Sequence, residues 1–359
     1  MKTIAIACGG SGGHIYPGLT LGHQLRTHGF DVVFMGSTLR MEKEKIPQAG
    51  FSFMGVPVRP FNRRRPLASA YNWWRCIGQA RAYLKQKQPV AMVGMGSYIS
   101  VPALVAARQL GIPIFLVETN KVPGKANQML ARLSQWVSLA YPESARAFPK
   151  TETFVDGTPV RPEFGSIDRE TGAKAFGLNP EHPVLTITGG SQGAKAINDA
   201  VLHNLRDLLQ IEGLQIVHMC GAANFDQIRA EPILSGVQDR YHLLEYVENM
   251  PALLAVTDLG LVRAGALTIA EMMACEIPVI LVPGTFGGGH QKDNALAVEA
   301  AGAGIMLEEP QLQEKLVQTV RDVILSTEKQ QQMRQNSKTL NTRDAADHIV
   351  TRMINSLTV

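Results

Sequence analysis

Two glycine-rich segments are the first candidates for chemistry in this sequence of 359 residues. Each follows a short apolar run: IAIAC precedes Gly9–Gly13, and VLTIT precedes Gly189–Gly193. A glycine turn between a strand and a helix lets backbone N–H groups approach an anion, and the helix N-terminus adds a partial positive charge. Tight packing alone would explain one such turn about as well. Two turns at equivalent places favour phosphate binding.

Neither glycine segment matches the two best-known nucleotide-binding motifs. No Gly-Lys-Ser/Thr follows the glycines, as a P-loop requires, and neither segment has the spacing GxGxxG. The expected strand Asp31–Met35 also ends without the acid that would hold the ribose of NAD. A nucleotide bound by this chain would therefore be held in another way.

A third turn of small residues, Arg263–Thr268, follows an expected strand and precedes the expected helix Ile269–Ala274. Ligands of open α/β sheets bind at such strand ends. Glu271 lies three residues beyond Thr268, so we expect its carboxylate on the first turn of the helix. There it could accept hydrogen bonds from both hydroxyls of a ribose. A favourable interaction with the helix dipole alone would also explain an acid at this place.

The loop Gly287–Asn294, further along the chain, carries His290 and Gln291. Imidazole and amide groups suit sugar hydroxyls, which need both hydrogen-bond donors and acceptors. Together with the glycine turns and the acid, this loop indicates a nucleotide sugar as the ligand.

The elements that must position these segments alternate between strand and helix. Such alternation predicts βαβ units with parallel sheets. The chain exceeds what one hydrophobic core usually serves, and IAIACGGSGG resembles LTITGGSQGA 180 residues later. We therefore expect two similar α/β domains, residues 1–160 and 161–343, and a helix, 344–357, that packs back on the first. The expected strands are Thr3–Cys8, Asp31–Met35, Val90–Gly94, Ile112–Glu118, Val184–Thr188, Gln215–Cys220, His242–Glu245, Leu259–Val262 and Pro278–Val282, and the further helices are Leu19–Arg26, Val101–Gln109, Ala196–Leu209 and Leu312–Leu325.

Charge is distributed unevenly along the chain. The net charge is +4, but residues 1–165 carry +12 and residues 166–359 carry −8. The basic half suggests that one domain faces an anionic partner, and nucleic acid and an anionic membrane surface are both candidates.

Within the basic half, residues 59–87 mix arginines with apolar side chains, among them Arg63, Arg64, Arg65, Trp73, Trp74 and Ile77. A segment of this kind can lie at a membrane interface, with its arginines on anionic head groups. Solvated arginines and tryptophans packed in the core would give the same composition. We expect one of the two tryptophans to pack inward.

No stretch approaches the roughly 20 apolar residues that span a bilayer, and the N-terminal apolar run is too short for a cleaved signal. The four cysteines have no CxxC spacing, which fits a reduced, cytosolic chain. No DxD-like acid pair stands at the end of an expected strand, so we expect no obligatory metal in the mechanism. We also expect no cofactor.

Six motifs stand in the order and spacing of the MurG family of N-acetylglucosaminyltransferases: GGSGGHIYPG, GMGSYIS, DGTPVR, GGSQGA, VRAGALTIAE and HQKDNA. The sequence resembles that family over nearly its whole length. The resemblance implies a GT-B fold, in which two Rossmann-like domains with parallel sheets face each other across a cleft.

The family's reaction is an inverting, metal-independent transfer of GlcNAc from UDP-GlcNAc to the C4 hydroxyl of lipid I. Lipid I is undecaprenyl-pyrophosphoryl-MurNAc-pentapeptide, and the product is lipid II for peptidoglycan. The resemblance implies a peripheral protein on the cytoplasmic face of the bacterial plasma membrane that meets an anionic membrane surface and binds no nucleic acid.

The resemblance also implies roles for individual residues. Ser11, Gly12, Gly13 and Asn120 would contact the acceptor or the donor sugar. The donor would be held by Arg161, Ser191, Gln192, Gly193, Val247, Ala266, Leu267, Thr268, Glu271, His290 and Gln291. Within that set, the diphosphate would lie on Ser191–Gly193, the ribose on Glu271 and the uracil on the backbone at Val247.

Transfer to an alcohol needs a base that takes the proton and a group that stabilises the departing UDP. His14 is the preferred base, since its ordinary pKa lies near neutrality and it stands beside a helix start; a histidine that only caps the glycine turn is the alternative. Glu118, at the end of an expected strand, is the competitor. Backbone N–H groups of Gly189–Gly193 would stabilise the UDP.

Three other functions remain open. Another GT-B transferase would share the fold, but the full motif set argues against it. A nonhydrolysing UDP-sugar epimerase also shares the fold, and isomerisation of UDP-GlcNAc without transfer would favour it. A basic nucleic-acid-binding protein would leave the glycine segments without a role.

Overall fold

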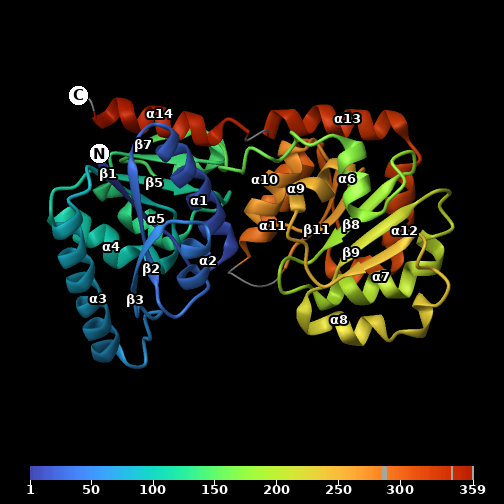
Figure 1. The fold of residues 1–359 in the computed structure, drawn as a ribbon, viewed down its shortest axis with the longest axis horizontal. Helices are drawn as coiled ribbons and strands as arrows, with labels where there is room; N and C mark the ends of the chain where they lie inside the picture. The colour runs from blue at the N-terminus through green and yellow to red at the C-terminus, as the bar shows by residue number, and fades with distance from the viewer. Residues whose placement is uncertain (285–288, 341–342, 358–359) are drawn as a thin grey trace. The chain divides into compact units, whose positions relative to one another are not determined.

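The computed structural model describes residues 1–284, 289–340 and 343–357, which form two α/β units (Figure 1). The first unit contains Met1–Arg161 and Thr342–Val359, and the second contains Pro162–Asn341. Each unit has one sheet, and every described pair of neighbouring strands is parallel. The expected α/β class with parallel sheets is confirmed.

The sheet of the first unit has seven strands in the order β3-β2-β1-β4-β5-β6-β7. The chain runs outward from β1 in one direction through β3 and then returns to β4 and runs outward in the other direction. Ligands of open α/β sheets bind at the carboxyl ends of the two strands where the order reverses, here β1 and β4. The strands are β1 (Thr3–Ala7), β2 (Asp31–Ser37), β3 (Ser52–Val56), β4 (Ala91–Gly94), β5 (Ile114–Glu118), β6 (Trp136–Leu139) and β7 (Glu152–Val155).

Helices cover both faces of this sheet, which explains why its strands are apolar on both sides. Ile4 and Ile6 of β1 pack on the face that carries α1 and α14, and Ala5 and Ala7 on the face that carries α3 and α4. The helices are α1 (Gly12–Thr27), α2 (Glu42–Gln48), α3 (Pro66–Lys87), α4 (Ser97–Gln109), α5 (Lys125–Leu130) and α14 (Ala345–Leu357), with 3₁₀ turns η1 (Ala131–Leu133) and η2 (Pro142–Ala147).

The sheet of the second unit has six strands in the order β10-β9-β8-β11-β12-β13. The order reverses between β8 and β11, so the carboxyl ends of these two strands are the expected ligand site of this unit. The strands are β8 (Val184–Thr188), β9 (Gln215–Met219), β10 (Tyr241–Leu244), β11 (Leu259–Arg263), β12 (Val279–Val282) and β13 (Gly304–Met306).

The second unit has its own core on both faces of its sheet. One cluster packs α7 and α12 on the sheet, and a smaller one packs α6 and α9 on it. The helices are α6 (Arg169–Phe176), α7 (Lys195–Leu208), α8 (Ala222–Arg229), α9 (Met250–Val256), α10 (Ala266–Ala274), α11 (His290–Ala300), α12 (Leu312–Ile324) and α13 (Thr327–Ser337), with 3₁₀ turns η3 (Pro232–Leu234), η4 (Glu309–Gln311) and η5 (Lys338–Leu340).

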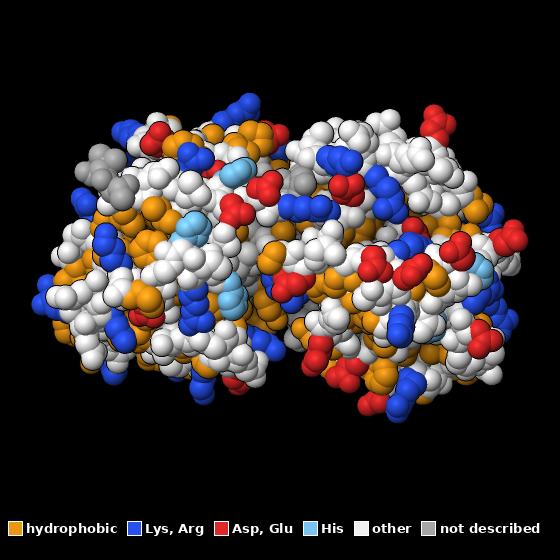
Figure 2. Space-filling view, turned by 45° about the horizontal axis from the view of Figure 1, so that its top comes forward, with side chains coloured by type: hydrophobic (Ala, Val, Ile, Leu, Met, Phe, Trp, Pro, Cys, Tyr) orange, Lys and Arg blue, Asp and Glu red, His pale blue; other side chains and the backbone are white. Residues whose placement is uncertain are grey.

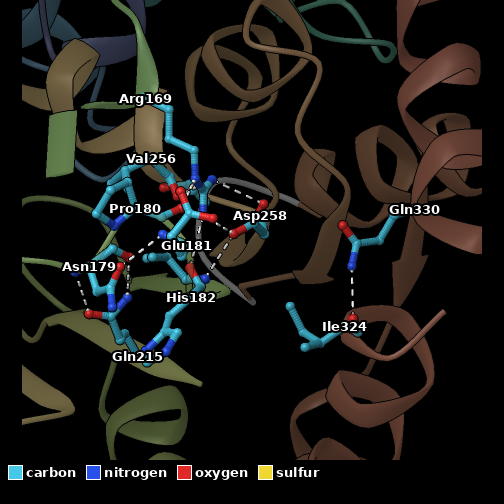
Figure 3. Close-up of polar contacts among 12 residues, drawn as sticks. Arg169, Asn179, Pro180, Glu181, His182, Gln215, Val256, Asp258, Ile324 and Gln330 are labelled. Atoms are coloured by element: carbon cyan, nitrogen blue, oxygen red, sulfur yellow. Dashed lines mark hydrogen bonds and ion pairs between the residues drawn. The ribbon is translucent and has the colours of Figure 1, made fainter. Parts of the chain in front are cut away.

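Asp258 joins several elements at the amino ends of β8 and β11 (Figure 3). Its carboxylate accepts hydrogen bonds from Arg169 Nη2 at 2.8 Å, from the Val184 backbone N–H at 2.9 Å and from Arg334 Nη2 at 3.2 Å. Arg169 also donates to the carbonyls of Pro180, His182 and Val256. This cluster fastens α6 and α13 to the end of the sheet opposite the expected ligand site.

Most expected elements are confirmed within a few residues, and Val184–Thr188 matches β8. Two helices begin earlier than expected. α1 starts at Gly12 rather than Leu19, because Ser11 takes the extended N-cap conformation, and α10 starts at Ala266 rather than Ile269, because Gly265 takes it. The strands β3, β6, β7 and β13 were not predicted, and neither were the helices α2, α3, α5, α6, α8, α9, α11 and α13. Among the described residues, no helix is long and apolar enough to cross a membrane.

Candidate active site

The first glycine segment lies at the carboxyl end of β1, where the strand order of the first sheet reverses. Ala7 of β1 pairs with Gly94 of β4, so Gly9–Gly13 lies beside the turn that contains Gly96. Gly96 has a φ of +86°, which favours glycine. The sequence thus brings two glycine turns to one place in this unit.

A buried carboxylate lies directly beneath the first glycine segment. Glu42, at the start of α2, accepts hydrogen bonds from the Ser37 N–H at 3.0 Å and the Gly10 N–H at 3.2 Å, and its side chain is fully buried. A Cβ at Gly9 would overlap this carboxylate. Because Glu42 takes the Gly10 N–H, a ligand would meet the N–H groups of Ser11, Gly12 and Gly13 at the start of α1, which have no partner among the described residues. Glu42 belongs to no motif that sequence reasoning could have used.

His14 lies in the first helical turn of α1. Its ring lies between Ser11 and the turn that contains Gly96. Its Nδ1 lies 3.0 Å from the Ser11 hydroxyl, and a Cβ at Gly96 would lie 3.4 Å from its Nε2. Burial lowers the pKa of His14 below its usual value, and the nearby Glu118 carboxylate opposes that shift. The ring is therefore mainly neutral near pH 7, with Nε2 on the side of Gly96.

Glu118 has no free hydrogen-bonding capacity. Its buried carboxylate at the end of β5 accepts from the Asn120 N–H and amide at 3.0 and 3.2 Å, from the Gly124 N–H at 2.8 Å and from the Asn127 amide at 3.0 Å. Each carboxylate oxygen thus has two donors. This arrangement holds the loop that follows β5, and Asn120 is part of it rather than an isolated polar side chain.

The second glycine segment lies at the equivalent place in the second unit. Thr188 of β8 pairs with Val262 of β11, so Gly189–Gly193 lies beside the start of α10. The Gly193 N–H donates to the Gly190 carbonyl at 2.8 Å, which closes a turn with Ser191 and Gln192 exposed at its tip. A Cβ at Gly189 would overlap the backbone of the next residues, so the turn requires glycine there.

The first turn of α10 presents Ala266, Leu267 and Thr268 at the carboxyl end of β11. Glu271 is half-buried in the second turn of this helix, which corrects the expectation that it lies in the first. The error arose because Gly265 starts the helix three residues earlier than expected. An acid in the second turn is too far from the helix start for the dipole alone to account for it.

The start of α11 is fastened to the ends of two neighbouring strands. Gln291 Oε1 accepts the Gly284 N–H at 2.8 Å, and the Asn294 amide donates to the Ala264 carbonyl at 3.3 Å. The Gln291 amide nitrogen is left for another acceptor, and His290 Nδ1 is buried without a partner among the described residues. Residues 290–294 belong to α11 rather than to the expected sugar-binding loop, which corrects that expectation, and residues 287–288 lie outside the described residues.

Two further expected donor residues, Val247 and Arg161, belong to neither the glycine turns nor the helices α10 and α11. Val247 follows β10, and its side chain is buried among the residues of the smaller core, which leaves only its backbone for a ligand. Arg161 is half-buried as the last residue of the first unit. Their contacts with a nucleotide remain predictions.

The helix α3 and the turn before it carry exposed apolar side chains among arginines, which we call the α3 surface: Phe61, Arg63, Arg64, Arg65, Leu67, Tyr71, Trp74 and Arg75. Trp74 is 69% exposed, whereas Trp73 packs on the core and donates its Nε1–H to the Arg59 carbonyl at 2.9 Å. The expectation that one tryptophan packs inward is confirmed, and Ile77 is half-buried beside it. Figure 2 shows more Lys and Arg than acidic side chains over the visible face of the first unit.

Two family models match most of the chain. The glycosyltransferase family 28 N-terminal domain matches residues 4–138, and the glycosyltransferase family 28 C-terminal domain matches residues 184–349. The first match falls in the first unit, and the second covers most of the second unit and the start of α14.

Curated relatives align over nearly their full length. The UDP-N-acetylglucosamine--N-acetylmuramyl-(pentapeptide) pyrophosphoryl-undecaprenol N-acetylglucosamine transferase of Halothermothrix orenii is 34% identical over 92% of both chains. The protein of the same name from Leuconostoc mesenteroides is 33% identical over 99% of both chains.

Solved structures show the same fold. The crystal structure of Acinetobacter baumannii MurG superposes with a TM-score of 0.79 at 26% identity, covering 99% of this chain and 100% of that one. A UDP-GlcNAc 2-epimerase from Neisseria meningitidis bound to UDP-GlcNAc has a TM-score of 0.72 over 99% of this chain and 100% of that one, but is only 17% identical, so it shares the fold alone.

Proposed function

We infer, since this chain belongs to glycosyltransferase family 28 and within it to the MurG transferases, that it is a hexosyltransferase of peptidoglycan synthesis. It moves N-acetylglucosamine from UDP-GlcNAc to undecaprenyl-pyrophosphoryl-MurNAc-pentapeptide. The observation that carries this function is the pair of glycine turns, each at the strand-order reversal of its own sheet. The GT-B fold is shared with epimerases, whose identity to this chain is too low to carry their function.

We propose that the diphosphate of UDP lies on the second glycine turn. Its exposed tip, Ser191–Gln192, and the start of α7 offer backbone N–H groups and the positive end of a helix dipole. The same groups would stabilise the negative charge on UDP as the sugar leaves.

The resemblance to the MurG family supports the other proposed donor contacts. Glu271 accepts hydrogen bonds from the ribose hydroxyls, the backbone at Val247 holds uracil, and Ala266–Thr268 line the diphosphate and sugar. The Gln291 amide nitrogen, free after its oxygen accepts the Gly284 N–H, donates to a GlcNAc hydroxyl, with His290 beside it. Arg161 adds a cation near the nucleotide.

His14 is the base of the proposed reaction. If its Nδ1–H donates to the Ser11 hydroxyl 3.0 Å away, Nε2 keeps the lone pair that takes the proton of the acceptor's C4 hydroxyl. Glu118 is a poor alternative, because four hydrogen bonds already stabilise its carboxylate. Ser11, Gly12 and Gly13 then face the acceptor's pyrophosphate, with Asn120 near the sugar.

The α3 surface is the proposed contact with the anionic cytoplasmic face of the membrane, where the lipid acceptor lies. Its exposed Leu67 and Trp74 can enter the interface, while each arginine near an anionic surface contributes about 1 kcal/mol. Exchange of Trp74 for serine should weaken binding to phosphatidylglycerol vesicles, and 0.5 M salt should weaken it further. The protein is thereby proposed to be peripheral and not to bind nucleic acid.

The test of the function is turnover of UDP-GlcNAc with a short-chain lipid I analogue in the presence of EDTA. Formation of the disaccharide product and UDP is expected, since no step of the proposal uses a metal. Release of UDP without a disaccharide would sink the assignment. Isomerisation of UDP-GlcNAc without transfer would also sink it and would favour the epimerase.

A further inference from the structure

Three buried side chains form a chain of hydrogen bonds in the second unit that the proposed function does not use. The Tyr241 hydroxyl on β10 lies 2.7 Å from His218 Nδ1 on β9, and His218 Nε2 lies 3.0 Å from Asn198 Oδ1 on α7. The Asn198 amide nitrogen donates to the Cys220 carbonyl at 3.1 Å. All three side chains are at least 96% buried.

The direction of every hydrogen bond in this series is determined by the Cys220 carbonyl at its end. Because the Cys220 carbonyl can only accept, the Asn198 amide must point its nitrogen toward it and its oxygen toward His218. His218 must then carry its proton on Nε2, and its Nδ1 must accept the Tyr241 hydroxyl proton. Burial lowers the pKa of His218 to about 3, so the ring keeps this neutral form near pH 7.

The last member of this hydrogen-bonded series, the Cys220 carbonyl, lies against the second glycine turn. The Asn224 amide also donates to the Cys220 carbonyl at 3.1 Å, so both lone pairs of that oxygen are occupied and its direction is fixed. A Cβ at Gly193 would overlap the same carbonyl oxygen, and a Cβ at Gly221 would press on the backbone of Gln192 and Gly193. The turn therefore rests directly on the Cys220–Gly221 backbone.

We propose that Tyr241 and His218 are positioning residues for the donor diphosphate: through Asn198 they fix the Cys220 carbonyl against which the turn Gly189–Gly193 is packed. The inference rests on the proposed function, since it takes this turn to be the diphosphate site. None of the three side chains touches the ligand. They act by holding the turn's N–H groups in the geometry that an anion needs.

Sequence reasoning could not find this chain of bonds. Its members come from three elements that are separate in the sequence, and a lone histidine on an apolar strand is usually a core residue. Only the pairing of β9 with both β8 and β10 brings them together.

The test measures UDP binding by calorimetry and steady-state kinetics in the full-length protein. Tyr241→Phe removes one hydroxyl without changing the shape of the core, and His218→Gln keeps a nitrogen that can donate to Asn198. We expect Tyr241→Phe to weaken UDP binding and raise the KM for UDP-GlcNAc about five- to tenfold, as the loss of one buried hydrogen bond would. The KM of His218→Gln should lie between those of Tyr241→Phe and the unchanged protein. In both variants kcat should change less than KM.

Asn204→Ala is the matched control. Asn204 is a buried asparagine on the same helix, and its amide donates to the Ala200 and Gln313 carbonyls, away from the glycine turn. It should cost stability but leave UDP affinity unchanged. If Tyr241→Phe alters UDP affinity no more than Asn204→Ala does, the positioning role is overturned. Failure of the unchanged protein to bind UDP would instead overturn the proposed function.

Discussion

The contacts of His14 decide which of its ring nitrogens can act. Ser11 occupies Nδ1, so Nε2 is the atom available to an acceptor hydroxyl. We expect His14→Ala to lower kcat at least about 100-fold, the usual contribution of a general base, with UDP affinity unchanged because the residue belongs to the other unit. Single-turnover rates measure the loss of activity, and calorimetry with UDP measures the affinity.

The pH dependence of the same residue has a definite sign. Only neutral His14 can take a proton, and burial places its pKa below the ordinary 6.5. The value of kcat/KM should therefore be level near pH 7 and fall as the pH drops through a midpoint below 6.5. A midpoint above 6.5, or an acidic limb that persists in His14→Ala, would assign the proton transfer to another group.

Glu271 tests the donor site at the level of one carboxylate. Glu271→Gln keeps an oxygen acceptor but loses the charge, and hydrogen bonds to charged groups contribute about 1.5–3 kcal/mol. The KM for UDP-GlcNAc should rise about 10- to 100-fold with a smaller change in kcat. Glu276→Gln is the control, since this acid pairs with Lys338 instead. Equal effects of the two exchanges would remove Glu271 from the ribose site.

Residue types were easier to predict than their surroundings. The sequence indicated the glycines, His14 and Glu271, because each stands at the end of an expected strand or in a familiar motif. It placed Glu271 in the wrong helical turn, since Gly265 could equally have belonged to the loop. It missed Glu42 and His218, whose importance comes from long-range contacts that no local spacing encodes.

At the level of elements, strands with apolar runs and clear ends were predictable, and β8 is the best case. β13 has only three residues, and β7 has four residues of which none is fully buried, so neither has a strong pattern. α3 was missed because only Cys76, Ala80 and Leu84 are buried along its 22 residues. The strand order, which creates both candidate sites, depends on pairing between segments far apart in the sequence.

The contacts of Asp258 predict how much two substitutions should destabilise the second unit. Asp258→Ala removes the acceptor of the Val184 N–H and the carboxylate that pairs with Arg169, which keeps only its backbone carbonyls. It should lower the free energy of unfolding by about 2–3 kcal/mol, less than a fully buried pair because both arginines are about one-third exposed. Arg334→Ala should cost less than about 1 kcal/mol, since Asp258 keeps Arg169. Urea unfolding measures both; similar losses would mean that the cluster does not centre on Asp258.

At the scale of the whole molecule, each unit has a core, a parallel sheet and a glycine turn of its own. The charge difference between the halves, +12 and −8, follows this division closely. It fits the proposed roles, in which the basic unit meets an anionic membrane and acceptor, while the other binds the donor mainly through backbone N–H groups. In this proposal the similarity of the two glycine segments reflects the repeated fold, and the two segments bind different ligands.

The C-terminal helix α14 makes the first unit depend on residues from the other end of the chain. Its buried Ile349 packs in the same cluster as α1, and Arg352 donates to the buried Asp156 carboxylate at 2.9 Å. Ile349→Ala should destabilise the first unit by about 2–4 kcal/mol and leave UDP affinity unchanged. Hydrogen exchange should then rise in β1 and β6 and stay constant in β8 and β11.

Ile324→Ala provides the reciprocal control, because Ile324 is a buried isoleucine on α12 in the core of the second unit. This substitution should raise hydrogen exchange in β8 and β11 and leave it unchanged in β1 and β6. Together the two variants distinguish a helix that stabilises only the first unit from a protein that unfolds as a whole. If either variant raises exchange equally in both sheets, the two units share one unfolding transition, and stability lost on the acceptor side would weaken donor binding as well.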